Sequence, residues 1–398
     1  MKIPLKRLIP ALATASALLL SACGGGGDPA APAASLSETS VQIAETAQEF
    51  SGSAAWVASD LRALPSSLAE PGAMKWHPGH YVVFGADEGG DVISAGLKET
   101  RHLPFVKGIV VRSYWRQLEP EKNRYAYDRI DPFVKKAAAD GKGFFLLLAT
   151  RAFTPGKGTP DYIKSPHYDG GVFAIKNVKG QPSENITLWD DDVRYRLAQL
   201  IRALGQRYNG HPNFEGIILS ETALGIPVEP ISPEKKAAFY KNLIYLDQVA
   251  RAAFPNSTVI RFANYPTDQT PAIVANLQRK GIGWGAPDIF LEDPSAEKYV
   301  YPYAETLRGQ IPIGMQVEPD SYHRRSSQGP WNPPDVNDLY TFGRDRLHSN
   351  YMFWVRDLKG ELRPWDKVLA MFNSPAFPAT PSGGLEATCP SKYRRCVE

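Results

Sequence analysis

The chain has 398 residues, of which 43% are hydrophobic and 22% charged, so it is long enough for one large domain with extensions or for two domains. Its 45 basic and 42 acidic residues nearly cancel and leave a formal charge of +3. A domain that binds nucleic acid normally carries clustered Lys and Arg and a strongly basic balance. We therefore expect no nucleic-acid partner.

The N-terminus has the pattern of an export signal. Basic residues within Met1 to Arg7 precede an apolar stretch, Leu8 to Leu20, that is too short and wrongly flanked for a membrane-spanning helix. We predict a signal peptide over residues 1–22. It ends in Leu-Ser-Ala before Cys23, which resembles the lipobox of bacterial lipoproteins, and this resemblance implies a lipid-modified N-terminus at Cys23. The alternative is an ordinary signal peptide with a chance cysteine.

The residues after Cys23 begin as a tether. A Gly run followed by a Pro/Ala-rich stretch, Gly24 to Ala34, has no means of packing. We predict that residues 23–79 form a lipidated tether and an N-terminal layer on the edge of the domain that follows. Gly24 rather than Asp follows the cysteine, and for many Gram-negative lipoproteins this implies an anchor in the outer membrane.

Short apolar or β-rich runs recur from His80 onward. Runs of this length, bounded by Gly and charged residues, are typical of strands that are buried on both faces, as in parallel sheets. The candidate strands are Tyr81 to Gly85, Gly108 to Trp115, Gly143 to Thr150, Phe214 to Glu221, Thr258 to Asn264, Asp288 to Glu292, Ile311 to Glu318 and Tyr351 to Val355.

Helical patterns lie between these runs. The clearest one places apolar residues from Val193 to Tyr208 on a single stripe. Strand and helix alternate along the chain, which predicts the fold class α/β, a parallel (β/α)8 TIM barrel over residues 80–375. Further helices are expected over 130–138, 239–254, 269–280, 296–308, 335–348 and 364–373, with a weak pattern after the first strand.

Two connections are long: residues 151–189 after the third strand and 319–334 after the seventh. Both would lie at the carboxyl ends of the strands, where barrel enzymes place their active sites. Loops of this length without a helix of their own are usually functional or disordered. Their aromatic residues, among them Trp189 and Trp331, favour the wall of a cleft, because flat rings with polar tips suit sugars; each ring could also fill a core.

Two of the predicted strands are eight-residue runs with the same form that end in Glu. They are Phe214 to Glu221 and Ile311 to Glu318, and each would deliver a carboxylate to the mouth of the barrel. In this arrangement the chain resembles the clan of retaining glycoside hydrolases built on (β/α)8 barrels, whose acid/base Glu follows strand four and whose nucleophile Glu follows strand seven. Further similarity lies in Val111 to Glu121 and in Ala203 to Pro212, and the resemblance covers about residues 80–375.

The resemblance implies that Glu221 is the acid/base and Glu318 the nucleophile. Hydrolysis with retention needs a protonated carboxyl that donates to the leaving oxygen and an ionised one that attacks the anomeric carbon, about 5 to 5.5 Å apart. Two close carboxylates also raise the pKa of one of them, which keeps an acid protonated near neutral pH. Each Glu could instead belong to a structural salt bridge.

The same resemblance suggests substrate-binding residues. Arg112 ends strand two, where the clan often places an Arg that holds the nucleophile ionised, although it could also pair with a surface acid. Trp354 on strand eight would form the floor of the subsite for the reacting sugar, or would fill the barrel. Trp115 and Asn264, at the ends of strands two and five, are further candidates.

The chain departs from the clan at two strand ends. Most members have Asn before the acid/base, and here the residue is Ser220, whose shorter side chain bears on substrate class and on activity. Strand six would end in Leu291 to Asp293, where an aromatic residue or His is common. Glu292 or Asp293 could bind a sugar hydroxyl, replace Glu318 in the catalytic pair, or pair with a basic residue.

Apart from Cys23 the chain has two cysteines, Cys389 and Cys396, in a C-terminal tail over residues 376–398. In an exported chain, two cysteines this close are expected to form a disulfide, which would stabilise mainly the tail itself. The sequence has no CxxC motif or His/Cys cluster, so we expect no structural metal site. The hydrolase mechanism that the resemblance implies uses neither a metal nor an organic cofactor.

These observations predict a monomeric, lipid-anchored retaining glycoside hydrolase that cleaves β-glycosidic bonds in a polysaccharide or oligosaccharide. Ser220 favours a second hypothesis, a barrel that only binds glycan, in exopolysaccharide export or surface attachment. A third hypothesis is an inverting hydrolase that uses Glu292 or Asp293. The sugar itself is left open, because one barrel fold serves many specificities.

Overall fold

The computed structural model describes residues 73–397, apart from 153, 178 and 179. The predicted signal peptide, the lipidation at Cys23 and the tether lie outside the described residues and stay predictions. Among the helices that the structure describes, none is both long and apolar enough to cross a membrane.

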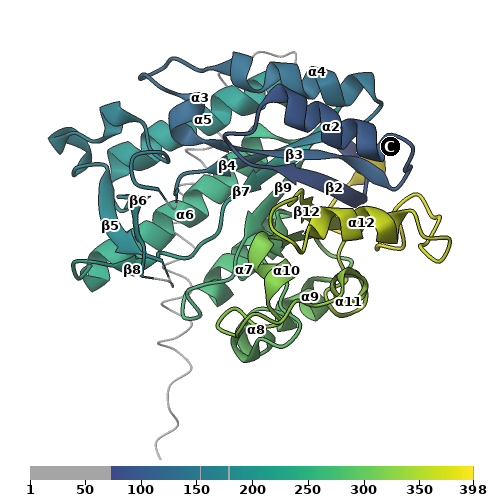
Figure 1. Cartoon of the computed structure of the whole chain (residues 1–398). Helices are drawn as coiled ribbons and strands as arrows, with labels where there is room; N and C mark the ends of the chain where they lie inside the picture. The colour runs from purple at the N-terminus through teal and green to yellow at the C-terminus, as the bar shows by residue number, and fades with distance from the viewer. Residues whose placement is uncertain (1–72, 153, 178–179, 398) are drawn as a thin grey trace, which may run out of the picture. The chain divides into compact units, whose positions relative to one another are not determined.

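Parallel strands close into a barrel (Figure 1). Around it the strands follow the order β10, β11, β12, β2, β3, β4, β7, β9, and every neighbouring pair is parallel. The predicted (β/α)8 fold is thus confirmed. The strands are β2 (Gly79–Phe84), β3 (Val106–Tyr114), β4 (Gly143–Ala149), β7 (Phe214–Leu219), β9 (Thr258–Phe262), β10 (Gly283–Ala286), β11 (Ile313–Val317) and β12 (Tyr351–Val355).

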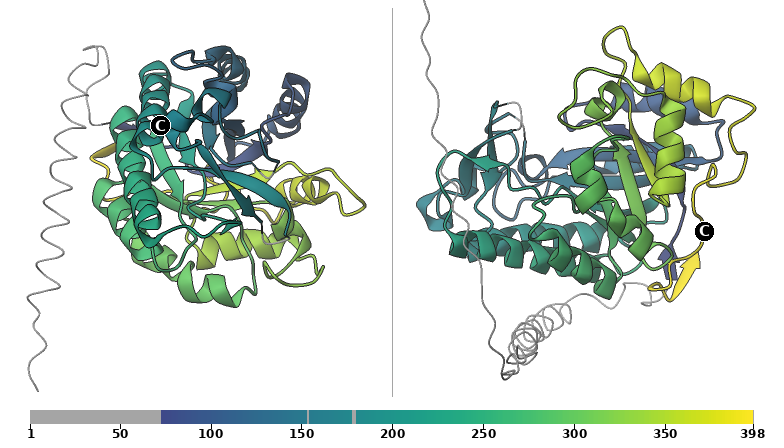
Figure 2. Two further views of the ribbon diagram at one scale, coloured as in Figure 1. Left: turned by 90° about the vertical axis from the view of Figure 1, so that its left-hand side faces the viewer. Right: turned by 90° about the horizontal axis from the view of Figure 1, so that it is seen from below.

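Helices cover the outside of the barrel (Figures 1 and 2). In α5 the Asp190 side chain caps the N-terminus by accepting from two backbone N–H groups, and the predicted apolar stripe is buried. The predicted helix over 296–308 is split, because Pro302 begins a new helix. The helices are α2 (Gly90–Thr100), α3 (Trp115–Leu118), α4 (Asp131–Ala139), α5 (Asp191–Tyr208), α6 (Pro233–Ala253), α7 (Thr270–Lys280), α8 (Pro294–Tyr299), α9 (Pro302–Leu307), α10 (Pro319–His323), α11 (Val336–Thr341) and α12 (Pro364–Phe372). Short 3-10 helices are η1 (Tyr127–Arg129), η2 (Asp161–Ile163) and η3 (Pro166–Tyr168), and η4 (Phe342–Arg346) is a π-helix.

The sixth strand is not where the sequence predicted it. The segment from Asp288 to Glu292 is a loop, and the strand is β10, which ends at Ala286. Its Gly-Trp-Gly-Ala sequence has weak β-propensity, so the pattern did not stand out. Packing explains the glycine, because a Cβ at Gly285 would collide with the carbonyl of Gly314 on the neighbouring strand β11.

Aromatic rings fill the interior of the barrel. Side chains alternate between the two faces of a strand, and the inward positions carry Tyr81, Phe145, Tyr351 and Phe353. The Tyr351 and Phe353 rings are stacked with their centroids 6.1 Å apart. The barrel is therefore a packed core below its mouth and not a channel.

The N-terminal end of the barrel is closed by both ends of the described chain. Strand β1 (Ala73–Lys75) pairs in parallel with β13 (Arg395–Val397). The predicted disulfide between Cys389 and Cys396 is present. The tail does more than the sequence suggested, because Tyr393 packs on Trp76, which in turn packs edge-on against Tyr351 of the barrel.

The opposite end carries a small antiparallel sheet. Strands β5 (Val172–Lys176), β6 (Pro182–Ile186) and β8 (Ile226–Pro227) pair in the order β6, β5, β8, so the long loop after β4 folds partly as a hairpin. In the right-hand view of Figure 2, this teal sheet and the β1–β13 pair lie at opposite ends.

Candidate active site

Polar side chains gather at the carboxyl ends of the barrel strands. Because all of these strands are parallel, their C-terminal ends meet at a single mouth. Following the chain from β2 to β11, the side chains at or just beyond the strand ends are Glu88, Arg112, Arg151, Glu221, Asn264, Asp288 and Glu318.

Glu318 is held by two donors. The guanidinium of Arg112 forms an ion pair with its carboxylate, and Gln316 Nε2 donates to the same oxygen. The nearby charge of Glu318 raises the pKa of Arg112, even though burial opposes this. The side chain of Glu318 is 20% exposed, so it is open to a ligand. Both contacts orient the carboxylate towards the mouth of the barrel, where a nucleophile would act.

Glu221 also stands beside a cation. It forms an ion pair with Arg151, which additionally donates to the carbonyl of Ala223 at 2.8 Å. Asn264 Nδ2 donates to the other Glu221 oxygen at 3.2 Å. These contacts favour the ionised carboxylate, whereas an acid/base must carry a proton at the start of the reaction. Sequence reasoning missed Arg151, because a basic residue after a strand gives no sign of its partner.

Asp288 is a carboxyl that sequence reasoning did not assign to the site, because the predicted strand began at this residue. It lies two residues beyond β10 and is half-buried. Burial, with the charges of Glu318 and Asp320, raises its pKa to about 8, and Arg112 opposes this shift. Glu88, near β2, also has a raised pKa because of burial. The mouth thus contains more carboxyl groups than the two that the sequence assigned to catalysis.

The two tryptophans that the sequence placed at the substrate lie elsewhere. Trp354 is fully buried between β12 and α12, where its indole N–H donates to His80 Nδ1 at 3.0 Å. Strand alternation turns Phe353, and not Trp354, towards the barrel interior. Trp115 is fully buried too, and donates to Glu119 at 2.9 Å. Both predicted substrate contacts are therefore corrected.

The acids after the sixth strand have structural partners. Glu292 is 60% exposed and pairs with Arg325 at 2.6 Å. Asp293 caps α8 and also accepts from Ser327 N at 2.8 Å. The structure therefore favours the ion-pair alternative for Glu292 over a contact with sugar. Ser220 directly precedes Glu221, and its carbonyl accepts from Arg261 at 2.7 Å.

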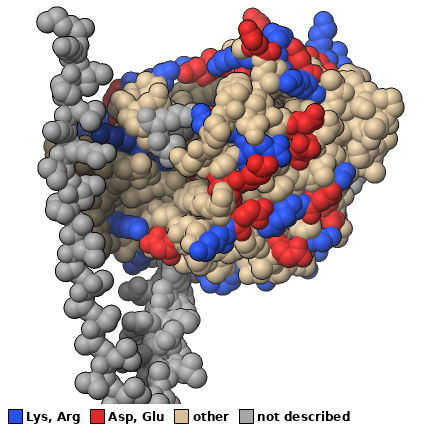
Figure 3. All heavy atoms as spheres, turned by 60° about the horizontal axis from the view of Figure 1, so that its bottom comes forward, with Lys and Arg blue, Asp and Glu red and all other residues tan. Residues whose placement is uncertain are grey.

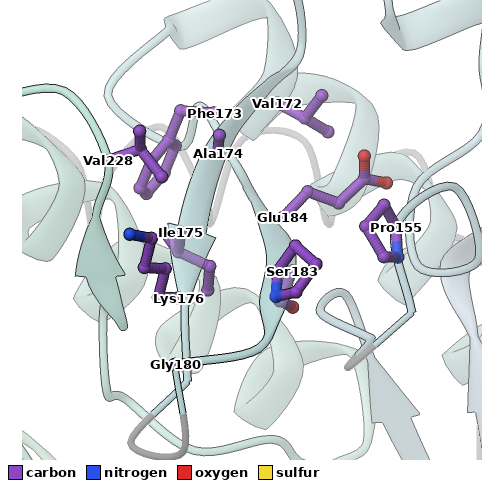
Figure 4. Close-up of a pocket in the computed structure, with 11 residues that line it drawn as sticks. Pro155, Val172, Phe173, Ala174, Ile175, Lys176, Gly180, Ser183, Glu184 and Val228 are labelled. Carbon is purple, nitrogen blue, oxygen red and sulfur yellow. The ribbon is translucent and has the colours of Figure 1, made fainter.

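The loops around the mouth present exposed rings and a separate pocket. Trp331 is 62% exposed and stacks on His323 with the ring centroids 4.4 Å apart. A pocket of about 330 Å³ lies against the β5–β6 hairpin, where Phe173, Ile175 and Glu184 are among the lining residues (Figure 4). Its lining includes neither Glu221 nor Glu318. We therefore place the candidate active site at the strand ends and not in this pocket.

The charges on one face of the molecule do not suggest a polyanionic ligand. On the face shown in Figure 3, basic and acidic side chains are interspersed, in keeping with the nearly balanced composition. Within the part of the chain that the structure describes, no group of three or more His, Cys, Asp or Glu could hold a metal ion.

The fold is that of the (β/α)8 barrels found among glycoside hydrolases, with carboxyl groups at the mouth. No family model and no curated protein matches the sequence. Among solved structures, a β-galactosidase from Bacillus circulans sp. alkalophilus matches with a TM-score of 0.50 and 11% identity, over 73% of this chain and 52% of that one.

Two further solved structures are similar. A β-galactosidase from the psychrophilic Marinomonas ef1 matches 74% of this chain with a TM-score of 0.49 and 9% identity. A GH5_18 protein from Streptomyces cattleya in complex with GlcNAc matches 76% of this chain with a TM-score of 0.49 and 14% identity. This chain covers 59% of the Marinomonas protein and 82% of the Streptomyces one. At 11% identity, the likeness to the Bacillus protein shows the barrel fold alone.

Proposed function

We propose that this protein is a retaining glycoside hydrolase that cleaves β-glycosidic bonds in a polysaccharide or oligosaccharide and is anchored in the cell envelope by a lipid on Cys23. The observation that carries the proposal is the pairing of Glu318 with Arg112 at the end of β11, in the same barrel mouth as Glu221. The likeness of the fold to the Bacillus β-galactosidase supports a barrel of the glycosidase type.

The proposed reaction has two steps. In the first, the Glu318 carboxylate attacks the anomeric carbon, and Glu221 gives its proton to the oxygen of the leaving sugar as the glycosidic bond breaks. In the second, the Glu221 carboxylate takes a proton from water, whose oxygen displaces Glu318 from the anomeric carbon. Arg112 and Gln316 assist by orienting the Glu318 carboxylate through their hydrogen bonds.

The contact between Arg151 and Glu221 sets a condition on this mechanism. Glu221 must be protonated before the first step, and a guanidinium beside it favours loss of that proton. Binding of the sugar must therefore separate the pair. When the pair separates, Arg151 still donates a hydrogen bond to the Ala223 carbonyl.

The test is hydrolysis of a panel of p-nitrophenyl β-glycosides and β-linked oligosaccharides by Glu318→Gln and Glu221→Gln. We expect Glu318→Gln to abolish turnover and Glu221→Gln to lower kcat by about 10²- to 10⁴-fold on natural oligosaccharides, the usual contribution of a positioned acid. Glu292→Gln is the matched control, because that carboxylate lies in a solvent-exposed ion pair. Full activity of either catalytic variant on the oligosaccharides refutes the assignment, and NMR of the first product anomer checks retention.

The alternative is a barrel that binds glycan without cleaving it. The ion pair of Glu221 with Arg151 and the serine at position 220 favour this alternative. This alternative is supported if the wild-type protein binds oligosaccharides but turns over no substrate of the panel.

The proposed lipid anchor is tested separately. Cys23→Ala should move the protein from the membrane fraction to the soluble fraction, and should abolish labelling with a palmitate analogue. Unchanged fractionation of the variant would contradict the anchor and would leave the hydrolase proposal intact.

A further inference from the structure

Asp288 lies among other acidic groups of the barrel mouth. The register pairs Ala286 of β10 with Met315 of β11, so Asp288, two residues further on, lies close to the end of β11, where Glu318 follows. Glu318 and Asp320 face it with negative charge, and Arg112 from β3 is the cation that offsets part of this.

The other neighbours of Asp288 add negative charge or are uncharged at neutral pH. Asp293, before α8, contributes a further negative charge. Tyr265, beyond β9, and Tyr301, before α9, also interact with the Asp288 carboxyl, and each has its own pKa raised, mainly by burial. Among the described residues, no hydrogen bond or ion pair to the Asp288 carboxyl is found.

We propose that Asp288 is a third carboxyl of the reacting site, where it binds a sugar oxygen as an uncharged hydrogen-bond donor. The inference rests on the proposed function and extends it to the residue that follows β10. An uncharged carboxyl avoids a second negative charge next to Glu318, and its O–H can donate to a hydroxyl or ring oxygen that the neighbouring carboxylates cannot serve.

The electrostatic surroundings agree with this role. Burial and the charge of Glu318 raise the pKa of Asp288 to about 8, so at neutral pH the group holds its proton. Low-polarity sites can keep a carboxylic acid neutral for the purpose of donating a hydrogen bond. As the pH rises through about 8, the Asp288 carboxyl loses its proton. It can then no longer donate a hydrogen bond and carries a negative charge, so sugar binding weakens.

Binding is measured in a Glu221→Gln background, which removes a titrating group and suppresses turnover while keeping Glu318. The probes are cellotetraose, mannotetraose, xylotetraose and β-1,4-galactotetraose, titrated calorimetrically between pH 6 and 10. We expect affinity for the sugar that binds to fall above about pH 8, at up to about tenfold per pH unit, the slope of one ionisation.

Two substitutions at position 288 separate the roles. Asp288→Asn keeps an uncharged donor and should bind independently of pH over this range, whereas Asp288→Ala should bind about tenfold more weakly at neutral pH, the loss of one hydrogen bond. The proposal is overturned if Asp288→Asn and Asp288→Ala both bind sugar as the Glu221→Gln parent does at every pH. Failure of all four probes to bind also counts against it.

The charge state has its own measurement, which is independent of sugar. In protein labelled with ¹³C at the Asp carboxyl carbons, the resonance that is missing from Asp288→Asn should titrate near pH 8, and titration below pH 5 overturns the proposal. If the wild-type protein binds sugar without hydrolysis, only the proposed hydrolase fails. If Asp288→Asn alone is inactive while Glu221→Gln is not, Asp288 is the proton donor and the binding role is wrong.

Discussion

Arg112 and Glu318 come from strands that are not neighbours, because β12 and β2 lie between β11 and β3 in the barrel. Their ion pair therefore crosses part of the mouth, and it forms because both side chains face the interior. Gln316, two residues before Glu318 and on the same face, adds a second donor from below. Glu318 is thus held in place by side chains from two strands, β3 and β11, and not by its own strand alone.

Replacing Arg112 should weaken catalysis more than it weakens folding. Arg112→Gln leaves a partly buried carboxylate without its cation, and removal of one partner of such a pair costs about 2 kcal/mol or more. If Glu318 must be ionised to attack, kcat/KM should fall by about 30-fold or more. Arg325→Gln, which breaks the exposed pair with Glu292, is the matched control and should change kcat/KM little. Equal kinetics for both variants would contradict the role of Arg112.

The sequence predicted site residues that follow long apolar runs and missed those whose place depends on contacts with other segments. Glu221, Glu318 and Arg112 end or follow long apolar runs, so their place at the mouth could be expected from chain order. Arg151 follows a strand that was also predicted, but its contact with Glu221 depends on the arrangement of two strand ends and their loops. Asp288 was missed because the strand before it is rich in glycine.

At the scale of one strand, β12 shows how sensitive such predictions are to register. Its position was predicted correctly from Tyr351 to Val355, yet the side chain chosen for the site faces the wrong way. A pleated strand alternates its faces with a period of two, so an error of one residue exchanges inside and outside. Hydrophobicity predicts where a strand lies in the sequence. Which of its side chains point into the barrel depends on how the strand pairs in the closed sheet.

The orientation of Trp354 leads to a prediction about stability. Burial lowers the pKa of His80 to about 3, so the ring is neutral, and its Nδ1 accepts from the indole. Trp354→Phe removes this donor and leaves a buried acceptor unpaired, which should cost about 1–3 kcal/mol in the free energy of unfolding measured in urea. The activity of the folded fraction should not change. Trp331→Phe, at an exposed ring, is the control and should alter unfolding by less than about 0.5 kcal/mol.

At the scale of the whole molecule, the two ends of the barrel have different tasks. One end carries the carboxyl groups and loops of the candidate site, and the other is closed by the β1–β13 pair and the disulfide. Buried Glu215 joins the closing segment to the barrel, since it accepts from His77 N at 2.9 Å and from the Tyr351 hydroxyl at 2.9 Å. Changes at the closed end should therefore affect stability without affecting the chemistry.

The disulfide tests this division directly. Cys389 and Cys396 are seven residues apart, and the chain-entropy argument for so short a loop gives about 2.5 kcal/mol of stabilisation. The double variant Cys389→Ser/Cys396→Ser should therefore unfold at a Tm lower by roughly 4 °C, a shift that follows from the size of the described domain. Its kcat/KM, measured well below that Tm, should equal that of the wild type, because the packing of Tyr393 on Trp76 lies at the end of the barrel away from Glu318. Dithiothreitol should lower the Tm of the wild-type protein to that of the variant and leave the variant unchanged. A fall in kcat/KM at full folding would show instead that the closed end is coupled to the mouth through the aromatic interior of the barrel.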